Sequence, residues 1–111
     1  MADKTSQISR DALLARIKAL LQDGFGQRLK GVVLYGSEAR GQATPDSDID
    51  LLVLLAGPVD ESPDSWRCIH ALYPLVLELE RPIHAEPVDI QDYEAGEFSL
   101  YRNAKREGIA V

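Results

Sequence analysis

The stretch Gly31-Val32-Val33-Leu34-Tyr35-Gly36-Ser37-Glu38-Ala39-Arg40-Gly41 decides the fold, together with Asp46-Ser47-Asp48-Ile49-Asp50 and the apolar run 51–55 that follows it. The apolar residues before Gly36 predict a buried strand that stops at Gly36-Ser37 and turns into a short helix. The run 51–55 is apolar on both of its faces, which is typical of a central strand covered on each side. Two buried strands are therefore expected, the first followed by a turn into a short helix.

Two carboxylates stand at the entrance of the second strand. Because side chains alternate along a strand, Asp48 and Asp50 are expected to point the same way, while Ile49 and Leu51 point into the core. Like charges this close repel each other, and a divalent cation is the usual remedy. Magnesium prefers oxygen ligands such as carboxylates and nucleotide phosphates, and a glycine-serine turn offers backbone N–H groups to phosphate. The sequence therefore predicts a magnesium and nucleotide site on these two stretches.

Gly36-Ser37, ten intervening residues and Asp48-Ile49-Asp50 resemble the signature of the DNA polymerase β-like nucleotidyltransferase superfamily. The longer wording, Gly-Ser-x-Ala-Arg-Gly followed by Asp-Ser-Asp-Ile-Asp-Leu-Leu-Val, is similar to its minimal nucleotidyltransferase (MNT) branch, whose characterised members act as antitoxins to HEPN-domain partners. The resemblance covers roughly residues 31–56. It implies an α/β fold of the α+β type, a small mixed sheet with packed helices, as in polymerase β-like nucleotidyltransferases. It also implies that Asp48 and Asp50 bind magnesium and that Gly36 and Ser37 orient the phosphates of ATP.

Two side chains of the turn qualify this resemblance. Arg40 has two equally weighted interpretations, a contact with phosphate oxygens of the nucleotide or an ion pair with a neighbouring carboxylate. Glu38 stands where the family commonly has an arginine or another residue that is not acidic. A carboxylate there weakens the attraction for a triphosphate unless it faces away from the site.

Active family members place a third acidic residue on a later strand, facing the paired aspartates. The corresponding strand here is expected from about residue 81 or 82 to Asp89, and alternation places His84 and Glu86 on one of its faces. The expected aspartate aligns with His84. We predict Glu86 as the third catalytic and metal-binding carboxylate, and the alternatives for His84 are a base or a surface imidazole.

The remaining elements follow from periodicity and capping. Ser9 is the expected N-cap of a helix that ends at Gly24, and Ser62-Pro63 starts a second helix that runs to about Glu80. Pro74 makes the second helix either kinked or divided in two. Its expected apolar side consists of Trp66, Ile69, Leu72, Tyr73, Val76 and Leu79.

The C-terminal part is expected to contain an acidic turn over 89–96, a helix over 97–107 and an apolar tail over 109–111. Pro87 lies in the strand expected to end at Asp89, and it indicates that this strand lies at an edge of the sheet or carries a bulge. The tail either packs back or meets a partner.

Length and charge bound the class of protein. A chain of 111 residues suits one domain, expected over 9–111 after a flexible N-terminus at 1–8. The net charge of −6 argues against direct nucleic-acid binding, which depends on clustered Lys and Arg. Cys68 stands alone, which favours a small buried side chain over a catalytic thiol. With no signal-peptide pattern and no apolar run long enough to span a membrane, the sequence predicts a cytoplasmic protein.

The sequence is compatible with two functions. The first is magnesium-dependent transfer of AMP from ATP to a hydroxyl of a HEPN-type partner protein, since the chain shows no domain that would hold an acceptor and no recognisable pocket for a small-molecule acceptor. The second is a catalytically reduced protein that neutralises its partner by binding alone, which Glu38 and the missing third aspartate favour. The oligomeric state is left open.

Overall fold

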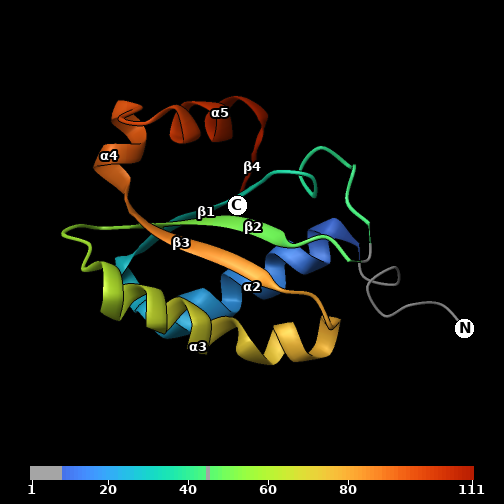
Figure 1. Ribbon diagram of the computed structural model, residues 1–111. Coiled ribbons are helices and arrows are strands. Elements are labelled where there is room, and N and C mark those ends of the chain that lie inside the picture. Colours follow the sequence, from blue (N-terminus) through green and yellow to red (C-terminus); the bar gives the residue numbers. More distant parts are fainter. Residues whose placement is uncertain (1–8, 45) are drawn as a thin grey trace, which may run out of the picture.

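A mixed sheet with strand order β3-β2-β1-β4 forms the centre of the computed structural model, which describes residues 9–44 and 46–111 (Figure 1). The predicted flexible N-terminus, 1–8, lies outside the described residues. The strands are β1 (Leu29–Tyr35), β2 (Ile49–Leu55), β3 (Ile83–Asp89) and β4 (Ile109–Ala110). β1 runs antiparallel to β2 and β4, whereas β2 and β3 are parallel. This arrangement confirms the predicted small mixed sheet.

Helices cover both faces of the sheet (Figure 1). Helices α2 (Arg10–Phe25) and α3 (Glu61–Leu79) pack on one face, and α4 (Ile90–Ala95) and α5 (Ser99–Glu107) lie on the other. A short 3-10 turn, η1 (Gly26–Arg28), joins α2 to β1. No helix in the described ranges combines the length and the apolar character needed to cross a membrane.

The central strand β2 is buried on both faces, as its sequence predicts. Ile49, Leu51, Val53 and Leu55 belong to the core shared with α2 and α3, whereas Leu52 and Leu54 belong to the core shared with α4 and α5. The alternation of side chains therefore distributes this strand between two apolar layers. It also sends Asp50 away from the α2 and α3 layer that receives Ile49 and Leu51.

The first helix begins as predicted but ends later. The Ser9 hydroxyl accepts a hydrogen bond from the Ala12 amide at 3.1 Å. The helix continues through Gly24 to Phe25, and Gly26, with φ of 59°, provides its end. Gly24 serves helix packing instead, because a Cβ there would lie 3.2 Å from the Cβ of Ala71 in α3. The prediction that the helix ends at Gly24 is therefore wrong.

Helix α3 differs from the prediction at its start and at its midpoint. It begins at Glu61, with Asp60 rather than Ser62 at the N-cap position, and the Asp64 carboxylate inside the helix accepts a hydrogen bond from the Asp60 amide at 3.0 Å. The helix continues through Pro74 as one element, which excludes the alternative of two short helices.

The predicted apolar side of α3 is only partly the buried one. Leu72 and Leu79 are buried as expected, but Trp66, Ile69 and Tyr73 are 61%, 54% and 55% exposed. Two apolar stripes at helical spacing share this helix, so periodicity alone cannot select the packed one. The stripe that faces the sheet consists of Cys68, Leu72, Leu75 and Leu79. Burial raises the pKa of the Cys68 thiol to about 12, consistent with a purely structural side chain.

The C-terminal part contains more regular structure than predicted. The expected turn over 89–96 includes α4, whose N-cap is Asp89, because its carboxylate accepts the Gln91 amide at 2.9 Å. The last helix begins at Ser99 instead of residue 97. The tail packs back as β4 against Val33 and Leu34 of β1. The prediction that β3 lies at an edge of the sheet is confirmed.

Truncation of a core leucine tests this account of burial. Leu51→Ala removes a fully buried side chain of β2, and we expect a loss of about 2–5 kcal/mol in the free energy of unfolding. The matched variant Leu77→Ala, at a site that is 60% exposed on α3, is expected to change it by less than about 0.5 kcal/mol. Urea denaturation measures both. Equal losses in the two variants would contradict the assignment of the packed face.

Candidate functional site

The pairing of β1 with β2 brings the glycine-serine turn against one of the two aspartates. Tyr35, the last residue of β1, pairs with Asp50 of β2. The chain then turns at Gly36 with φ of 77°, and a Cβ at this position would lie 2.6 Å from the Asp50 carboxylate oxygen Oδ2. Only glycine combines this backbone conformation with this close approach. The positive φ and the close approach of Asp50 together explain why position 36 carries no side chain.

The segment after Gly36 is a run of hydrogen-bonded turns instead of the expected short helix. The amide of Arg40 donates to the Gly36 carbonyl at 3.2 Å, and the amide of Gln42 donates to the Ser37 carbonyl at 2.9 Å. These bonds span different numbers of residues, so no regular helix forms. The turn nevertheless holds Gly36 and Ser37 at the end of β1 beside Asp50.

Asp48 and Asp50 form the electrostatic centre of the site. Asp48 is exposed immediately before β2, and the side chain of Asp50 is 29% exposed. Burial raises the pKa of the Asp50 carboxyl, the nearby His84 lowers it, and repulsion from Asp48 raises it further. The charge of Asp48 thus disfavours the ionised form of Asp50. Carboxylate oxygens are ligands that magnesium prefers, so this pair suits a divalent cation.

The register of β3 separates the two candidates for the third site residue. His84 pairs directly with Asp50, and its Nδ1 lies 4.0 Å from the Asp50 oxygen Oδ1. Glu86 pairs with Leu52, one step further along the same face. Within 9–44 and 46–111, no group of three or more His, Cys, Asp or Glu side chains is arranged to hold a metal ion. The role of Glu86 as third ligand stays a prediction.

The carboxylate of Glu38 is neutralised by a residue that the sequence analysis did not single out. Its Oε1 lies 2.6 Å from Nη2 of Arg81, a side chain that is only 3% exposed. Arg40 is exposed and donates from Nε to the side-chain oxygen of Gln42 at 3.2 Å. Contact of Arg40 with phosphate stays a prediction. The sequence did not indicate that Arg81 is buried, because it follows a helix and precedes a strand, where a charged residue is usually exposed.

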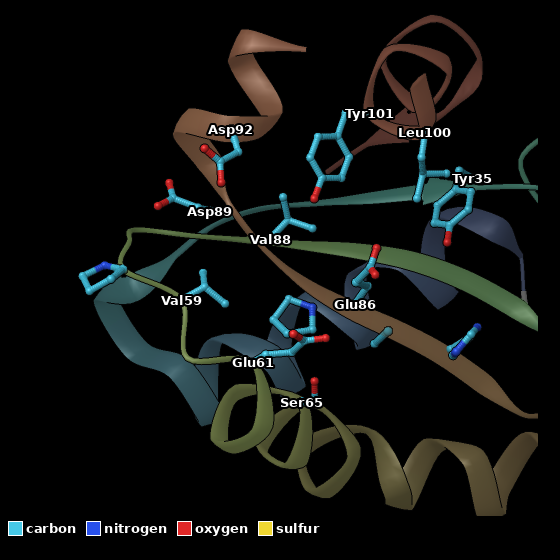
Figure 2. A pocket seen from close by; sticks show the side chains of 14 residues that line it. Tyr35, Val59, Glu61, Ser65, Glu86, Val88, Asp89, Asp92, Leu100 and Tyr101 are labelled. Atoms are coloured by element: carbon cyan, nitrogen blue, oxygen red, sulfur yellow. The ribbon is translucent and has the colours of Figure 1, made fainter. Parts of the chain in front are cut away.

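An open groove of about 780 Å³ adjoins this site, although the sequence indicated no pocket (Figure 2). Its wall near Asp50 contains His84 and Tyr35, and the hydroxyl of Tyr35 and the carboxylate of Glu86 point toward one another (Figure 2). Burial, Asp50 and Glu86 together raise the pKa of Tyr35. Further carboxylates come from segments that are distant in sequence, namely Glu61, Asp89 and Asp92. The groove is therefore acidic and opens beside the paired aspartates.

A mixed sheet with a glycine-serine turn against Asp50, and with Asp48 immediately before the same strand, is an arrangement suited to a domain that handles nucleotides. The family model described as "Nucleotidyltransferase domain" matches residues 14–110. The chain belongs to this family, and membership supports the transferase class.

Solved structures with the same fold support this assignment. A crystal structure of a toxin-antitoxin with AMP-PNP aligns with a TM-score of 0.65 and 23% identity, covering 87% of this chain and 70% of that chain. Two mutants of the toxin-antitoxin MntA-HpeT align with TM-scores of 0.62 and identities of 24% and 20%, each again covering 87% of this chain, and 69% and 70% of theirs. A search of curated proteins finds no significant match.

Substitution of Gly36 tests the contact with Asp50. Gly36→Ala and Gly41→Ala both place a side chain at positive φ, 77° and 71°, but a Cβ at Gly41 meets nothing within 4 Å. Each is expected to lose about 1–2 kcal/mol of stability from backbone strain. Only Gly36→Ala is expected to displace the Asp50 carboxylate, measured as a changed NMR shift of that carboxyl carbon. A similar shift in Gly41→Ala would contradict the proposed contact.

The raised pKa of Asp50 predicts a pH dependence of stability in metal-free protein. In the folded state, the Asp50 carboxyl keeps its proton to higher pH than in the unfolded chain, where its pKa is near 3.8. The stability that this proton contributes is therefore complete below pH 3.8, and it is lost as the pH rises through the pKa of the folded state. Asp50→Asn cannot ionise and is expected to be more stable than the wild type at neutral pH. Thermal unfolding in a chelator across this range should show the advantage disappearing toward pH 3.8. An advantage independent of pH would contradict the electrostatic explanation.

Proposed function

We propose that this protein is a magnesium-dependent nucleotidyltransferase that transfers AMP from ATP to a hydroxyl group of a partner protein. The observation that carries the proposal is the close approach of Gly36 to Asp50, with Asp48 next to it. Phosphate-binding backbone and cation-binding carboxylates are thereby neighbours on a domain of the nucleotidyltransferase family.

Each residue of the site has a distinct role in this proposal. Asp48 and Asp50 hold the magnesium ions, and the backbone of Gly36 with the hydroxyl and N–H of Ser37 orients the triphosphate. Arg40 is exposed on the same turn and reaches toward phosphate oxygens. Bound magnesium supplies neutralisation of charge on the attacking and leaving oxygens. The carboxylate of Glu38 is paired with Arg81 and does not oppose the nucleotide.

The acidic groove is the proposed route for the acceptor. An acceptor hydroxyl that enters beside Tyr35 and His84 reaches the side of the site next to Asp50. Its oxygen forms a bond to the α-phosphorus of ATP, the bond to the pyrophosphate breaks, and the hydroxyl proton passes to a base. His84 and Glu86 are the candidates for this base, because both line the groove.

The partner is proposed from the similar structures. They are toxin-antitoxin complexes, one of them with AMP-PNP. Together with the resemblance of the motif to minimal nucleotidyltransferases, this supports a HEPN-type toxin as the partner and ATP as the nucleotide donor. The protein would then act as an antitoxin by modifying its toxin.

Calorimetric titration of ATP tests the nucleotide site. Binding is expected in the presence of magnesium and is expected to fall at least about tenfold without it or in Asp50→Asn, because one tenfold step corresponds to only about 1.4 kcal/mol of lost interaction. Asp23→Asn, an exposed position on α2, serves as the matched control and should bind like the wild type. If ATP binds equally well to Asp50→Asn, the assignment of the metal site is wrong.

Mass spectrometry of the partner separates the two functions. Transfer adds an AMP group to the partner only in the presence of ATP and intact Asp48 and Asp50. Neutralisation of the partner by a variant with Asp48→Asn and Asp50→Asn, without added mass and without ATP, would support the binding-only alternative. One observation favours this alternative. Among the described residues, no three His, Cys, Asp or Glu side chains are arranged to hold a metal ion.

A further inference from the structure

A buried arginine joins the two segments that form the proposed nucleotide site. Arg81 follows the end of α3, and its side chain is 3% exposed. Its Nη2 lies 2.6 Å from Oε1 of Glu38, two residues after Gly36. Its Nε donates a hydrogen bond to the carbonyl of Ser47 at 3.0 Å, one residue before Asp48. One guanidinium therefore contacts both the phosphate-facing turn and the loop that carries the first aspartate.

A second arginine contacts the same turn. Arg10, the first residue of α2, donates from Nη1 to the Ala39 carbonyl at 3.2 Å and lies 3.5 Å from the Glu38 carbonyl. Within the described residues, the hydrogen bonds of Arg10 go to backbone carbonyls, whereas the contact of Arg81 with Glu38 joins two opposite charges. A charge removed from water is stable only when it is paired and hydrogen-bonded. The Glu38 carboxylate and the Ser47 carbonyl provide this pairing for Arg81, so they keep it in one place.

We propose that Arg81 and Glu38 form a positioning pair that sets the distance between the Gly36-Ser37 turn and the Asp48 loop, and thereby the geometry of phosphate and metal binding. This inference rests on the proposed nucleotide site. It also explains why a carboxylate at position 38 is compatible with a triphosphate. The negative charge of Glu38 is paired with Arg81 and does not face the triphosphate. The guanidinium donates a hydrogen bond to the Ser47 carbonyl through Nε and forms an ion pair with Glu38 through Nη2, whereas a lysine offers a single point charge.

Hydrogen exchange tests the positioning pair without any nucleotide. In Arg81→Met, the amides of Arg40 and Gln42, which close the turn, are expected to exchange at least about tenfold faster, the ratio that corresponds to about 1.4 kcal/mol. The amides of β2 should keep their wild-type rates. Glu38→Gln, which retains the shape of the side chain, is the second variant in case Arg81→Met does not fold. Wild-type exchange in the turn of a folded variant would overturn the proposal.

Arg28→Met is the matched control. It breaks another ion pair with a buried partner, between Arg28 and Asp64 at 2.8 Å, next to the opposite end of β1. This variant is expected to lose stability while the turn amides keep wild-type exchange relative to β2. Faster exchange confined to the turn in Arg28→Met as well would show that any lost ion pair has this effect, and it would overturn the specific role of Arg81.

Affinity for ATP with magnesium provides the functional readout. Arg81→Met is expected to weaken binding at least about tenfold, equivalent to about 1.4 kcal/mol, with Arg81→Lys intermediate and Arg28→Met unchanged. Unchanged affinity in Arg81→Met beside a binding wild type would overturn the positioning role and leave the proposed function intact. If the wild type itself does not bind, the proposed function fails, and the exchange experiment still decides whether the pair holds the turn.

A double variant separates positioning from stability alone. Replacing both partners, Arg81→Met with Glu38→Leu, removes the buried charges together and is expected to restore stability. The turn exchange and the nucleotide affinity should stay impaired, because no bond to the Ser47 carbonyl remains. Recovery of all three properties would mean that the pair serves stability only, and it would overturn the proposal.

Discussion

The antiparallel pairing of β1 with β2 is the constraint on which the rest of the site depends. This register sets Tyr35 opposite Asp50, so the chain leaves β1 directly over a carboxylate. A backbone can approach that closely only without a side chain, which explains Gly36. The same register buries β2 on both faces, with Asp50 between the buried residues Ile49 and Leu51. The strand pairing that packs the core therefore also positions Asp50 at the site.

Electrostatics divides the molecule into a neutralised part and an unneutralised part. At the turn, the charge of Glu38 is paired with that of the buried Arg81. At the site, Asp50 is partly buried beside Asp48, and the groove next to them adds Glu61, Glu86, Asp89 and Asp92. Carboxylates gathered in this way favour cations and disfavour a polyanion that arrives without one. A nucleotide bound to magnesium is compatible with this negative electrostatic field. So is an acceptor that is not a nucleic acid.

The exposed face of α3 and the acidic groove are distinct surfaces. Trp66, Ile69, Tyr73 and Leu77 remain largely exposed on the helix side that faces away from the sheet. The groove is lined by Glu61 and Ser65 at the N-terminal end of α3, by β3, and by residues of α4 and α5 (Figure 2). The two surfaces share no lining residue. The proposed transfer reaction involves the groove and does not involve the exposed apolar side chains of α3.

The two motif strands, the glycine at the turn and the small mixed sheet could be predicted from the sequence, because they follow from local patterns and from a motif that lies within residues 31–56. The sequence could not determine which of two apolar stripes on α3 is buried, nor that the acidic segment 89–96 contains a helix. Likewise, the contact between Arg81 and Glu38 and the groove beside His84 bring together residues far apart in sequence. Only tertiary structure decided these features, since burial and long-range pairing depend on what each segment packs against, and no local pattern records that.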